Sequence, residues 1–342
     1  AAALTPESSG PREGVSRSAE SIRAAYNSAH VPCFGRGEGA ASRFEAMTAT
    51  ATQQPKVLTS DQVEAYHERG YLLIEGAVSD TWLKRLQAAS EEFVDESRSL
   101  TESTRKLDLD PSHTPEDPRL RRLTSPVEHH VVFAEFTLHG PAAQIALDLL
   151  GSPARYHHSK LNYKWSGGGE AVEWHQDIQY WPHTDFTPLT IGVYLNDVDD
   201  EMGPMGIVPG SHTGELYNLY ADDNTTWTGS IRDQDLHKVD LASAEYLKGP
   251  AGSITVHNCG CVHGSMPNNS GRVRPLLLQT YSAHGSYPLL GVGANDATGR
   301  TSGFLIGQGD PARSLTVNGR SMPAAPDWSR GGYTTIFDVQ QG

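Results

Sequence analysis

Two His-x-Asp triplets lie eight positions apart in the segment 173–185, which reads EWHQDIQYWPHTD. They occupy residues 175–177 and 183–185. Residues two apart on a strand point to the same side of a sheet, so each triplet could present an imidazole and a carboxylate to one metal ion. A single triplet is weak evidence for a metal site, and further ligands elsewhere in the chain must support it.

The first triplet, His175 and Asp177, is the stronger candidate. If the strand continues, Trp181 shares their face, and an aromatic ring would then border the same site. Pro182 is expected to end such a run. We therefore interpret His183 and its partner in the second triplet as a polar pair in a loop.

A third ligand follows a second apolar run, GSITVHN, which is expected to form a strand that leads to His263. Two histidines and one carboxylate on one face of an ion leave its other face open for cosubstrate and oxygen. His257, on the expected strand itself, competes with His263 for this role. We favour His257 as a core residue or a residue that supports the ligands.

Arg274 begins the next expected strand, eleven residues after His263. A guanidinium binds both oxygens of a carboxylate, so Arg274 is suited to the far end of a bound dicarboxylate. Ser265 can donate a hydrogen bond to the same group. Arg272 is the alternative anchor, but it lies in an Asn- and Gly-rich turn where a solvated charge is more common.

With these residues in place, the chain resembles the phytanoyl-CoA dioxygenase family of Fe(II)- and 2-oxoglutarate-dependent oxygenases. The segment LNDVDDEMGPMGIVPGSH (195–212) is similar to the family's stretch between the metal ligands, and LTSDQVEAYHERGYLLIEG (58–76) is similar to its usual opening. The resemblance covers about residues 58–284. It implies a mainly β fold, the double-stranded β-helix (a cupin-like jelly roll), with flanking N-terminal α-helices.

The resemblance also assigns roles. It implies that His175, Asp177 and His263 are the catalytic Fe(II) ligands. The keto-acid end of 2-oxoglutarate would bind the metal and its other end would meet Arg274 and Ser265, with O2 as the second cosubstrate. Because Asp177 is present, the resemblance implies hydroxylation or desaturation rather than halogenation.

Three further positions resemble a small-molecule hydroxylase within the family. The stretch HHSKLNYK (157–164) is similar to one of its strands, which implies that His158 and Asn162 lie near 2-oxoglutarate or substrate. Trp181 is similar to an aromatic residue beside the cosubstrate, although core packing is nearly as good an interpretation. His158 stands where that hydroxylase has Gln, which points to a different substrate.

The residues around these motifs predict one enzyme domain. We expect a flexible extension at 1–55 and a single domain at 56–342, with a β core at about 155–284 and a C-terminal tail at 285–342. Helices are expected to begin after Thr59 and Ser79 and at Pro141. The charged, Pro-containing segment 95–125 is expected to be a loop or lid.

The composition restricts the partners. A formal net charge of −14 disfavours nucleic acid and anionic membranes, and no apolar run is long enough to span a bilayer. Three cysteines without metal-site spacing indicate reduced thiols. We expect a cytoplasmic protein that acts on a small molecule. The sequence leaves its oligomeric state open.

The functional hypothesis is an oxygenase that hydroxylates an unactivated C–H bond of a small molecule and releases succinate and CO2. One alternative is a cupin-like metal enzyme that does not use 2-oxoglutarate, which would not need Arg274 and Ser265. The other is a catalytically silent small-molecule binding protein, which would be expected to have lost a metal ligand.

Overall fold

The computed structural model describes residues 57–151, 154–167, 171–283, 286–289, 314–317, 320–323 and 335–341. The expected N-terminal extension, 1–55, lies outside the described residues, as does most of the tail at 285–342. The expected division of the chain into these parts stays a prediction.

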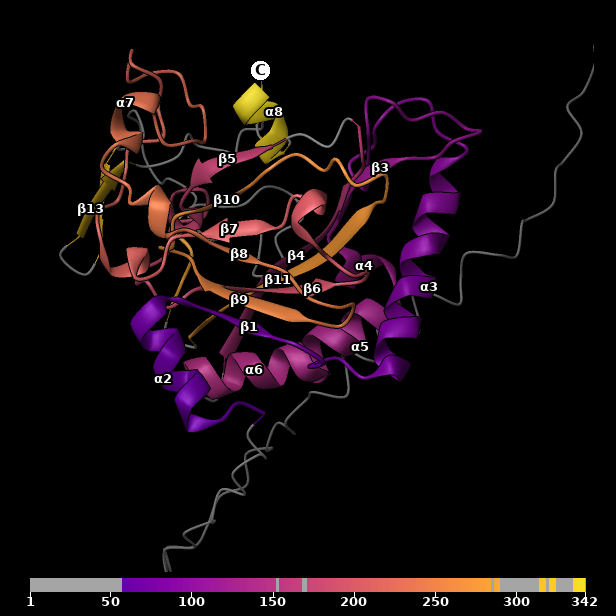
Figure 1. Ribbon diagram of the computed structural model, residues 1–342, viewed down its shortest axis with the longest axis horizontal. Helices are drawn as coiled ribbons and strands as arrows, with labels where there is room; N and C mark the ends of the chain where they lie inside the picture. Colours follow the sequence, from indigo (N-terminus) through magenta and orange to yellow (C-terminus); the bar gives the residue numbers. More distant parts are fainter. Residues whose placement is uncertain are drawn as a thin grey trace, which may run out of the picture.

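Two antiparallel sheets face each other and form the double-stranded β-helix that was predicted (Figure 1). The large sheet contains, in order, β1 (Tyr71–Ile74), β9 (Ile254–Asn258), β6 (Leu189–Tyr194), β11 (Arg274–Ala283), β4 (Ala154–Lys164), β3 (Leu120–Thr124) and β2 (Leu107–Leu109). The small sheet contains β5 (Val172–His175), β10 (His263–Ser265), β7 (Met205–Ile207) and β8 (Glu245–Leu247). A separate hairpin pairs β12 (Ser314–Val317) with β13 (Arg320–Pro323).

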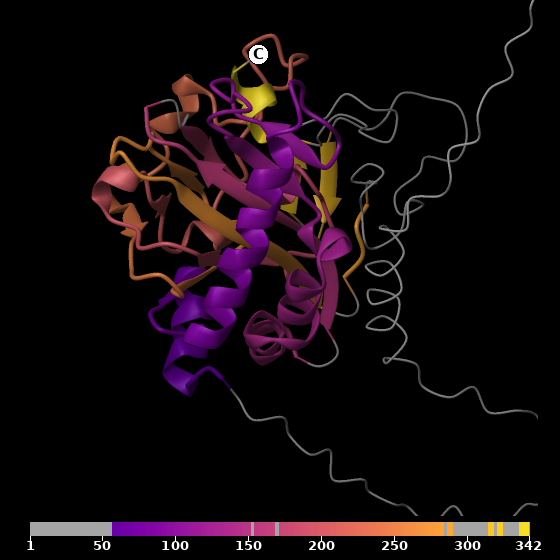
Figure 2. The same cartoon turned by 90° about the vertical axis from the view of Figure 1, so that its right-hand side faces the viewer.

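Helices from the N-terminal half cover the outer face of the large sheet. They are α2 (Ser60–Arg69), α3 (Asp80–Ser97), α4 (Pro126–His129), α5 (Val131–His139) and α6 (Pro141–Leu150). Their apolar side chains and those of the outer face of the sheet form the main core. Figure 2 shows the long helix α3, which contacts β2 and β3. Later in the chain, α7 (Asp233–Leu236) lies in a connecting segment, and α8 (Ile336–Gln341) packs against β5.

The predicted helix boundaries are confirmed where local chemistry determines them. Thr59 caps α2 and forms a capping box with Gln62, and Ser79 caps α3 through the backbone N–H of Trp82. Gly70 ends α2 with φ +83°, a left-handed conformation that favours glycine. A Cβ at this glycine would also lie 2.6 Å from the Cys261 sulfur, so the close approach requires Gly as well.

Two expectations about the sheet were wrong. The segment 95–125 is not only a loop or lid, because it contributes β2 and β3 to the edge of the large sheet. The β core is also not confined to 155–284, since β1 pairs with β9 from a position far upstream. Short runs such as LRRLT (120–124) carry too few alternating positions to be recognised without their partner strands.

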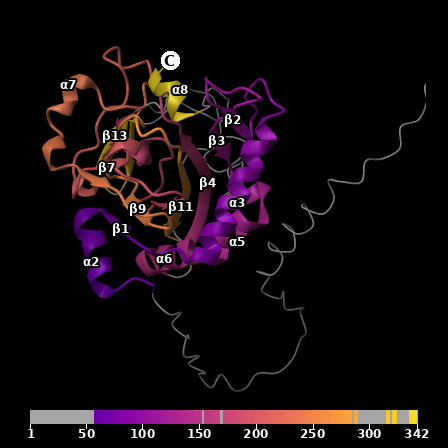
Figure 3. The same ribbon diagram turned by 45° about the vertical axis from the view of Figure 1, so that its right-hand side comes forward.

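The long strand β4 lies between the outer core and the inner space between the sheets, and Figure 3 shows it beside β11, the central strand of the large sheet. Tyr163 points outward, where its hydroxyl bonds to Ser90 of α3 at 2.8 Å. Lys164 points inward, where its ammonium donates to Ser265 of the small sheet at 2.6 Å. By strand alternation, the inward set on β4 is His158, Lys160, Asn162 and Lys164.

No helix in the described part of the chain has both the length and the apolarity needed to cross a membrane.

The two cysteines near the small sheet are buried, and we expect their thiols to be unreactive in the folded protein. Cys259 and Cys261 are both fully buried, and burial raises the pKa of Cys261 to about 12 and that of Cys259 well above its usual range. In a Cys33→Ser background, we expect neither thiol to react with an aromatic disulfide reagent at pH 8, because the thiolate is the reactive form. Both should react in denaturant, and rapid reaction of either thiol in the native protein would contradict this packing.

Candidate active site

The first His-x-Asp triplet lies at the end of β5, but not on one continuous strand. β5 ends at His175, and Asp177 begins the short 3₁₀ helix η1 (Asp177–Gln179). The continuous strand that would place Trp181 on the same face by alternation is therefore not formed. The turn still brings the two side chains together, since His175 Nε2 lies 3.6 Å from Asp177 Oδ1.

His263 reaches the same point from the neighbouring strand. It lies opposite His175 in the antiparallel pairing of β10 with β5, and their ring centroids are 4.2 Å apart. His263 Nε2 is 4.0 Å from Asp177 Oδ1, and one potential ligand atom from each of the three residues lies within 4.8 Å of the others. All three side chains are buried.

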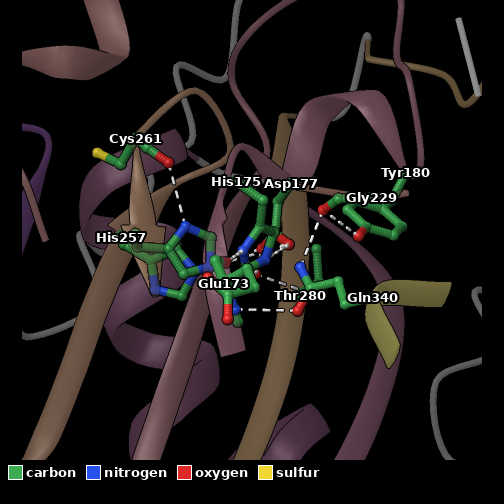
Figure 4. A network of polar contacts seen from close by, with 11 residues as sticks. Glu173, His175, Asp177, Tyr180, Gly229, His257, Cys261, Thr280 and Gln340 are labelled. Carbon is green, nitrogen blue, oxygen red and sulfur yellow. Dashed lines mark hydrogen bonds and ion pairs between the residues drawn. The ribbon is translucent and has the colours of Figure 1, made fainter. Parts of the chain in front are cut away.

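Backbone contacts set the orientation of both imidazoles. The Nδ1 atom of His175 lies 2.8 Å from the carbonyl oxygen of Glu173, and that of His263 lies 3.1 Å from the carbonyl of Cys261 (Figure 4). A carbonyl oxygen only accepts, so Nδ1 carries the proton in each ring. The Nε2 lone pairs are thereby left facing Asp177, as metal-ligating histidines require.

The protonation states also suit a cation. Burial alone raises the pKa of Asp177, but the neighbouring imidazoles of His263, His175 and His257 outweigh this effect and hold the pKa well below its usual range. Burial, reinforced by the neighbouring His175 and His257, lowers the pKa of His263 well below its usual range. An ionised carboxylate and a neutral imidazole are the forms that bind a metal.

A second layer of polar contacts holds the other oxygen of Asp177. His257 Nε2 lies 3.3 Å from Asp177 Oδ2, and the Thr190 hydroxyl donates to the same oxygen at 3.5 Å. Thr280 in turn bonds to Thr190 at 3.0 Å. Figure 4 shows His257 and Thr280 beside the His175–Asp177 pair. Because His257 faces Oδ2, its position differs from that of the other two histidines, which face Oδ1.

Two of the three distances between the ligand atoms fit a first-row metal ion directly, and the third lies within 4.8 Å. An ion about 2.1 Å from each of two ligands holds them no more than about 4.2 Å apart. The two distances to Asp177 Oδ1, 3.6 and 4.0 Å, are within this limit. Two imidazoles and one carboxylate on one side are the donor set of non-haem Fe(II) oxygenases. Among the described residues, this is the one group of His, Cys, Asp and Glu side chains that could hold a metal.

A group of cationic side chains lies near Ser265, two residues along β10 from His263. Arg274 is buried, donates from Nη1 to the Gly203 carbonyl, and leaves Nε without a partner among the described residues. It pairs in register with Lys164, whose ammonium donates to Ser265 Oγ. The structure thus places the predicted pair Arg274 and Ser265 at one end of the inner space. Lys164 was missed from the sequence, although its inward position follows from the alternation in KLNYK.

The remaining predicted cosubstrate residues line the inner space around β4. Asn162 accepts a hydrogen bond from Arg122 Nε at 3.1 Å. The buried ring of Trp181 lies 5.8 Å from the ring of His158. Trp181 also belongs to an apolar cluster, so both interpretations of this residue, core packing and pocket lining, describe part of its surroundings. Roles in cosubstrate binding for these residues stay predictions.

The second His-x-Asp triplet makes different contacts. Asp185 Oδ1 accepts hydrogen bonds from the nearby Thr187 and from Ser286, which is distant in sequence. His183 is fully buried, with Nδ1 2.7 Å from the Trp181 carbonyl. His183 was expected to lie in a polar loop, and its burial contradicts this. It is covered because the chain returns at Pro288, which forms a β-bridge with His183.

Arg272, the rejected alternative anchor, is half-exposed and pairs with Asp199. Its charge is therefore matched on the surface, away from the buried Arg274. The two arginines differ by two positions in sequence, but only Arg274 begins the β11 strand and points between the sheets.

The C-terminal helix closes one side of the site. Gln340 of α8 accepts a hydrogen bond from the Glu173 backbone N–H at 2.9 Å and donates to the Gly229 carbonyl at 2.9 Å (Figure 4). The Glu173 carbonyl is the same group that orients His175. This part of the expected C-terminal tail therefore packs onto the strand that carries His175.

The fold and this donor set define a class: a double-stranded β-helix with a two-histidine, one-carboxylate site. The family model for phytanoyl-CoA dioxygenase (PhyH) matches residues 66–276. The chain belongs to this family of Fe(II)- and 2-oxoglutarate-dependent oxygenases, and its enzyme class is that of 2-oxoglutarate-dependent dioxygenases.

Similar proteins agree with this membership. The chain is 28% identical to a "Probable alpha-ketoglutarate-dependent hypophosphite dioxygenase" of Stutzerimonas stutzeri, over 68% of this chain and 82% of the relative. It is 26% identical to an ectoine dioxygenase of Bordetella bronchiseptica, over 66% and 76%. The structure of EctD from S. alaskensis with 2-oxoglutarate and 5-hydroxyectoine shares the fold, with a TM-score of 0.55, 22% identity, and coverage of 70% of this chain and 82% of that one.

Proposed function

We propose that His175, Asp177 and His263 hold one Fe(II) and that the enzyme hydroxylates a C–H bond of a small molecule. The observation that carries the proposal is the convergence of two Nε2 atoms and one carboxylate oxygen at a buried point between the two sheets. When bound, iron supplies the oxidising chemistry with O2 and 2-oxoglutarate. Succinate and CO2 are the coproducts.

The second part of the proposal concerns 2-oxoglutarate. The buried cations Arg274 and Lys164, together with the partly buried Ser265, can hold the distal carboxylate with charge-assisted hydrogen bonds. The unpartnered Nε of Arg274 supports this assignment, since a buried donor without an acceptor is costly. We propose that Asn162, His158 and Trp181 line the cosubstrate or substrate.

The residues of this chain have defined tasks in the reaction. His257 and Thr190 hold one oxygen of the Asp177 carboxylate, so that the other oxygen faces the Nε2 atoms of His175 and His263. The two sheets exclude water from the site, which protects a reactive step from side reactions. Hypophosphite and ectoine, which the names of two relatives give as substrates, are small molecules, and this supports a small-molecule substrate here.

The wild-type protein is expected to form succinate from 2-oxoglutarate in an Fe(II)-dependent manner. A screen of small metabolites, including hypophosphite and ectoine, should identify compounds that stimulate this turnover, and mass spectrometry should show one added oxygen atom in the product. A product that has lost two hydrogens would indicate desaturation instead. Oxidation of a substrate without 2-oxoglutarate would favour a cupin-like enzyme of another type, and no iron-dependent turnover would favour a binding protein.

We place this activity in the cytoplasm. The two described cysteines are unpaired and buried, which suits a reducing compartment.

A further inference from the structure

Two cationic side chains enter the inner space from neighbouring strands at the edge of the large sheet. Arg122 of β3 is 5% exposed, and its register partner on β4 is Asn162. Arg122 Nε donates to the Asn162 side chain, which fixes the guanidinium on the inward face. Its buried Nη2 has no hydrogen-bond partner in the described part of the structure. A buried guanidinium nitrogen without a hydrogen-bond partner indicates that a ligand supplies the acceptor.

Lys160 is the second cation. It lies two residues from Asn162 on the same face of β4 and pairs with Leu278 of β11. Its pKa is lowered to about 8, mainly by burial; Asp177 raises this pKa, and the positive Arg122 lowers it to a smaller extent. No carboxylate among the described residues forms an ion pair with Lys160. Two like charges thus face one inner space without an anion between them, which is unfavourable unless a ligand supplies one.

The position of this pair is close to the metal-ligand group. His158 lies two residues from Lys160 on the inward face and pairs with Thr280, whose neighbour across β6 is Thr190. Thr190 donates to Asp177. An anion held by Lys160 would therefore lie along the same wall of the inner space as the carboxylate ligand.

The charges of 2-oxoglutarate and iron are matched without Arg122 and Lys160. This comparison rests on the proposed function. The distal carboxylate of 2-oxoglutarate is matched by Arg274 and Lys164, and its keto-acid carboxylate is matched by iron. Asp177 offsets part of the metal charge. Arg122 and Lys160 are then two positive charges for which the enzyme, iron and cosubstrate together contain no remaining anion.

We propose that Arg122 and Lys160 bind an anionic group of the primary substrate, so that the substrate class is small carboxylates or phosphorus oxyanions. Arg122 can present two N–H groups to such an oxyanion, and Lys160 adds a point charge. The pair fixes the charged end of the substrate at the β3–β4 edge. A C–H or P–H bond next to that group is thereby presented to the metal site.

The test is anaerobic calorimetry on wild-type protein loaded with Fe(II) and 2-oxoglutarate. The probes are hypophosphite and acetate, with acetamide as the uncharged match for acetate. We expect the anions to bind and acetamide to bind at least about tenfold more weakly, as expected for hydrogen bonds to a charged group. Arg122→Gln and Lys160→Gln should each weaken anion binding at least about tenfold, and Lys160→Arg should restore part of it.

Arg119→Gln is the matched control, because Arg119 lies three residues from Arg122 and pairs with Asp117 at the surface. It should leave anion affinity unchanged. Thermal unfolding of each variant verifies that the loaded protein is folded.

Equal binding of acetate and acetamide, or no binding of either anion, would overturn the proposal. So would variants that weaken 2-oxoglutarate binding as much as anion binding, since the pair would then serve the keto-acid carboxylate. Failure of the proposed function is distinguishable, because wild type would then show no iron-dependent succinate formation. Failure of the anion site alone leaves that turnover intact.

Discussion

Replacing Asp177 with alanine is expected to abolish iron-dependent succinate formation. The Oδ1 atom of this carboxylate is the point on which His175 and His263 converge, at 3.6 and 4.0 Å. Loss of a residue that merely supports a metal ligand typically lowers metal affinity or activity 10- to 100-fold, so loss of the ligand itself should lower turnover more than about 100-fold. The measurement is Fe(II) affinity by anaerobic titration, together with succinate formation.

The second His-x-Asp triplet supplies the matched control for Asp177. Asp185→Asn removes a carboxylate from the same kind of triplet but retains an oxygen that can accept from Thr187 and Ser286. Its Fe(II) affinity should equal that of wild type. If Asp185→Asn loses iron and Asp177→Ala keeps it, the assignment of the two triplets is reversed.

The second large effect is expected for Arg274→Gln. A hydrogen bond to a charged group contributes about 1.5–3 kcal/mol, so the affinity for 2-oxoglutarate should fall roughly 10- to 150-fold. Iron binding should persist, because Arg274 is not among the three residues that can hold the metal. The apparent KM for 2-oxoglutarate and the Fe(II) affinity, measured separately, separate these effects.

Arg272→Gln is the control for Arg274, since it removes a half-exposed arginine whose partner is Asp199. Surface ion pairs of this kind contribute about 0–1 kcal/mol, so this variant should bind 2-oxoglutarate as wild type does. A large rise in KM for Arg272→Gln with none for Arg274→Gln would place the cosubstrate at the turn instead.

The sequence predicts those parts of the site that depend on residue type and chain order. His175, Asp177 and His263 are recognisable because an imidazole–carboxylate pair precedes a second imidazole on a later strand. The local path between the first two was not predictable, since strand alternation and a 3₁₀ turn both bring His175 and Asp177 together. Only the hydrogen bonds of the turn, such as that from the Tyr180 N–H to the Asp177 carbonyl, distinguish the two paths.

Residues recruited from strands far apart in the chain were not predictable. Arg122 and Lys160 are ordinary charges in a polar sequence until β3 pairs with β4 and turns Arg122 inward. The charged, Pro-containing surroundings of β3 instead favoured a loop. Lys164 acquires its contact with Ser265 in the same way, through the approach of the two sheets.

A structure of the protein crystallised anaerobically with Fe(II) and 2-oxoglutarate tests the central claim most directly. The account predicts one iron bound by His175 Nε2, Asp177 Oδ1 and His263 Nε2, with 2-oxoglutarate on the same ion. Its distal carboxylate should contact Arg274. Iron at another group of side chains, or 2-oxoglutarate bound away from the iron, would contradict it.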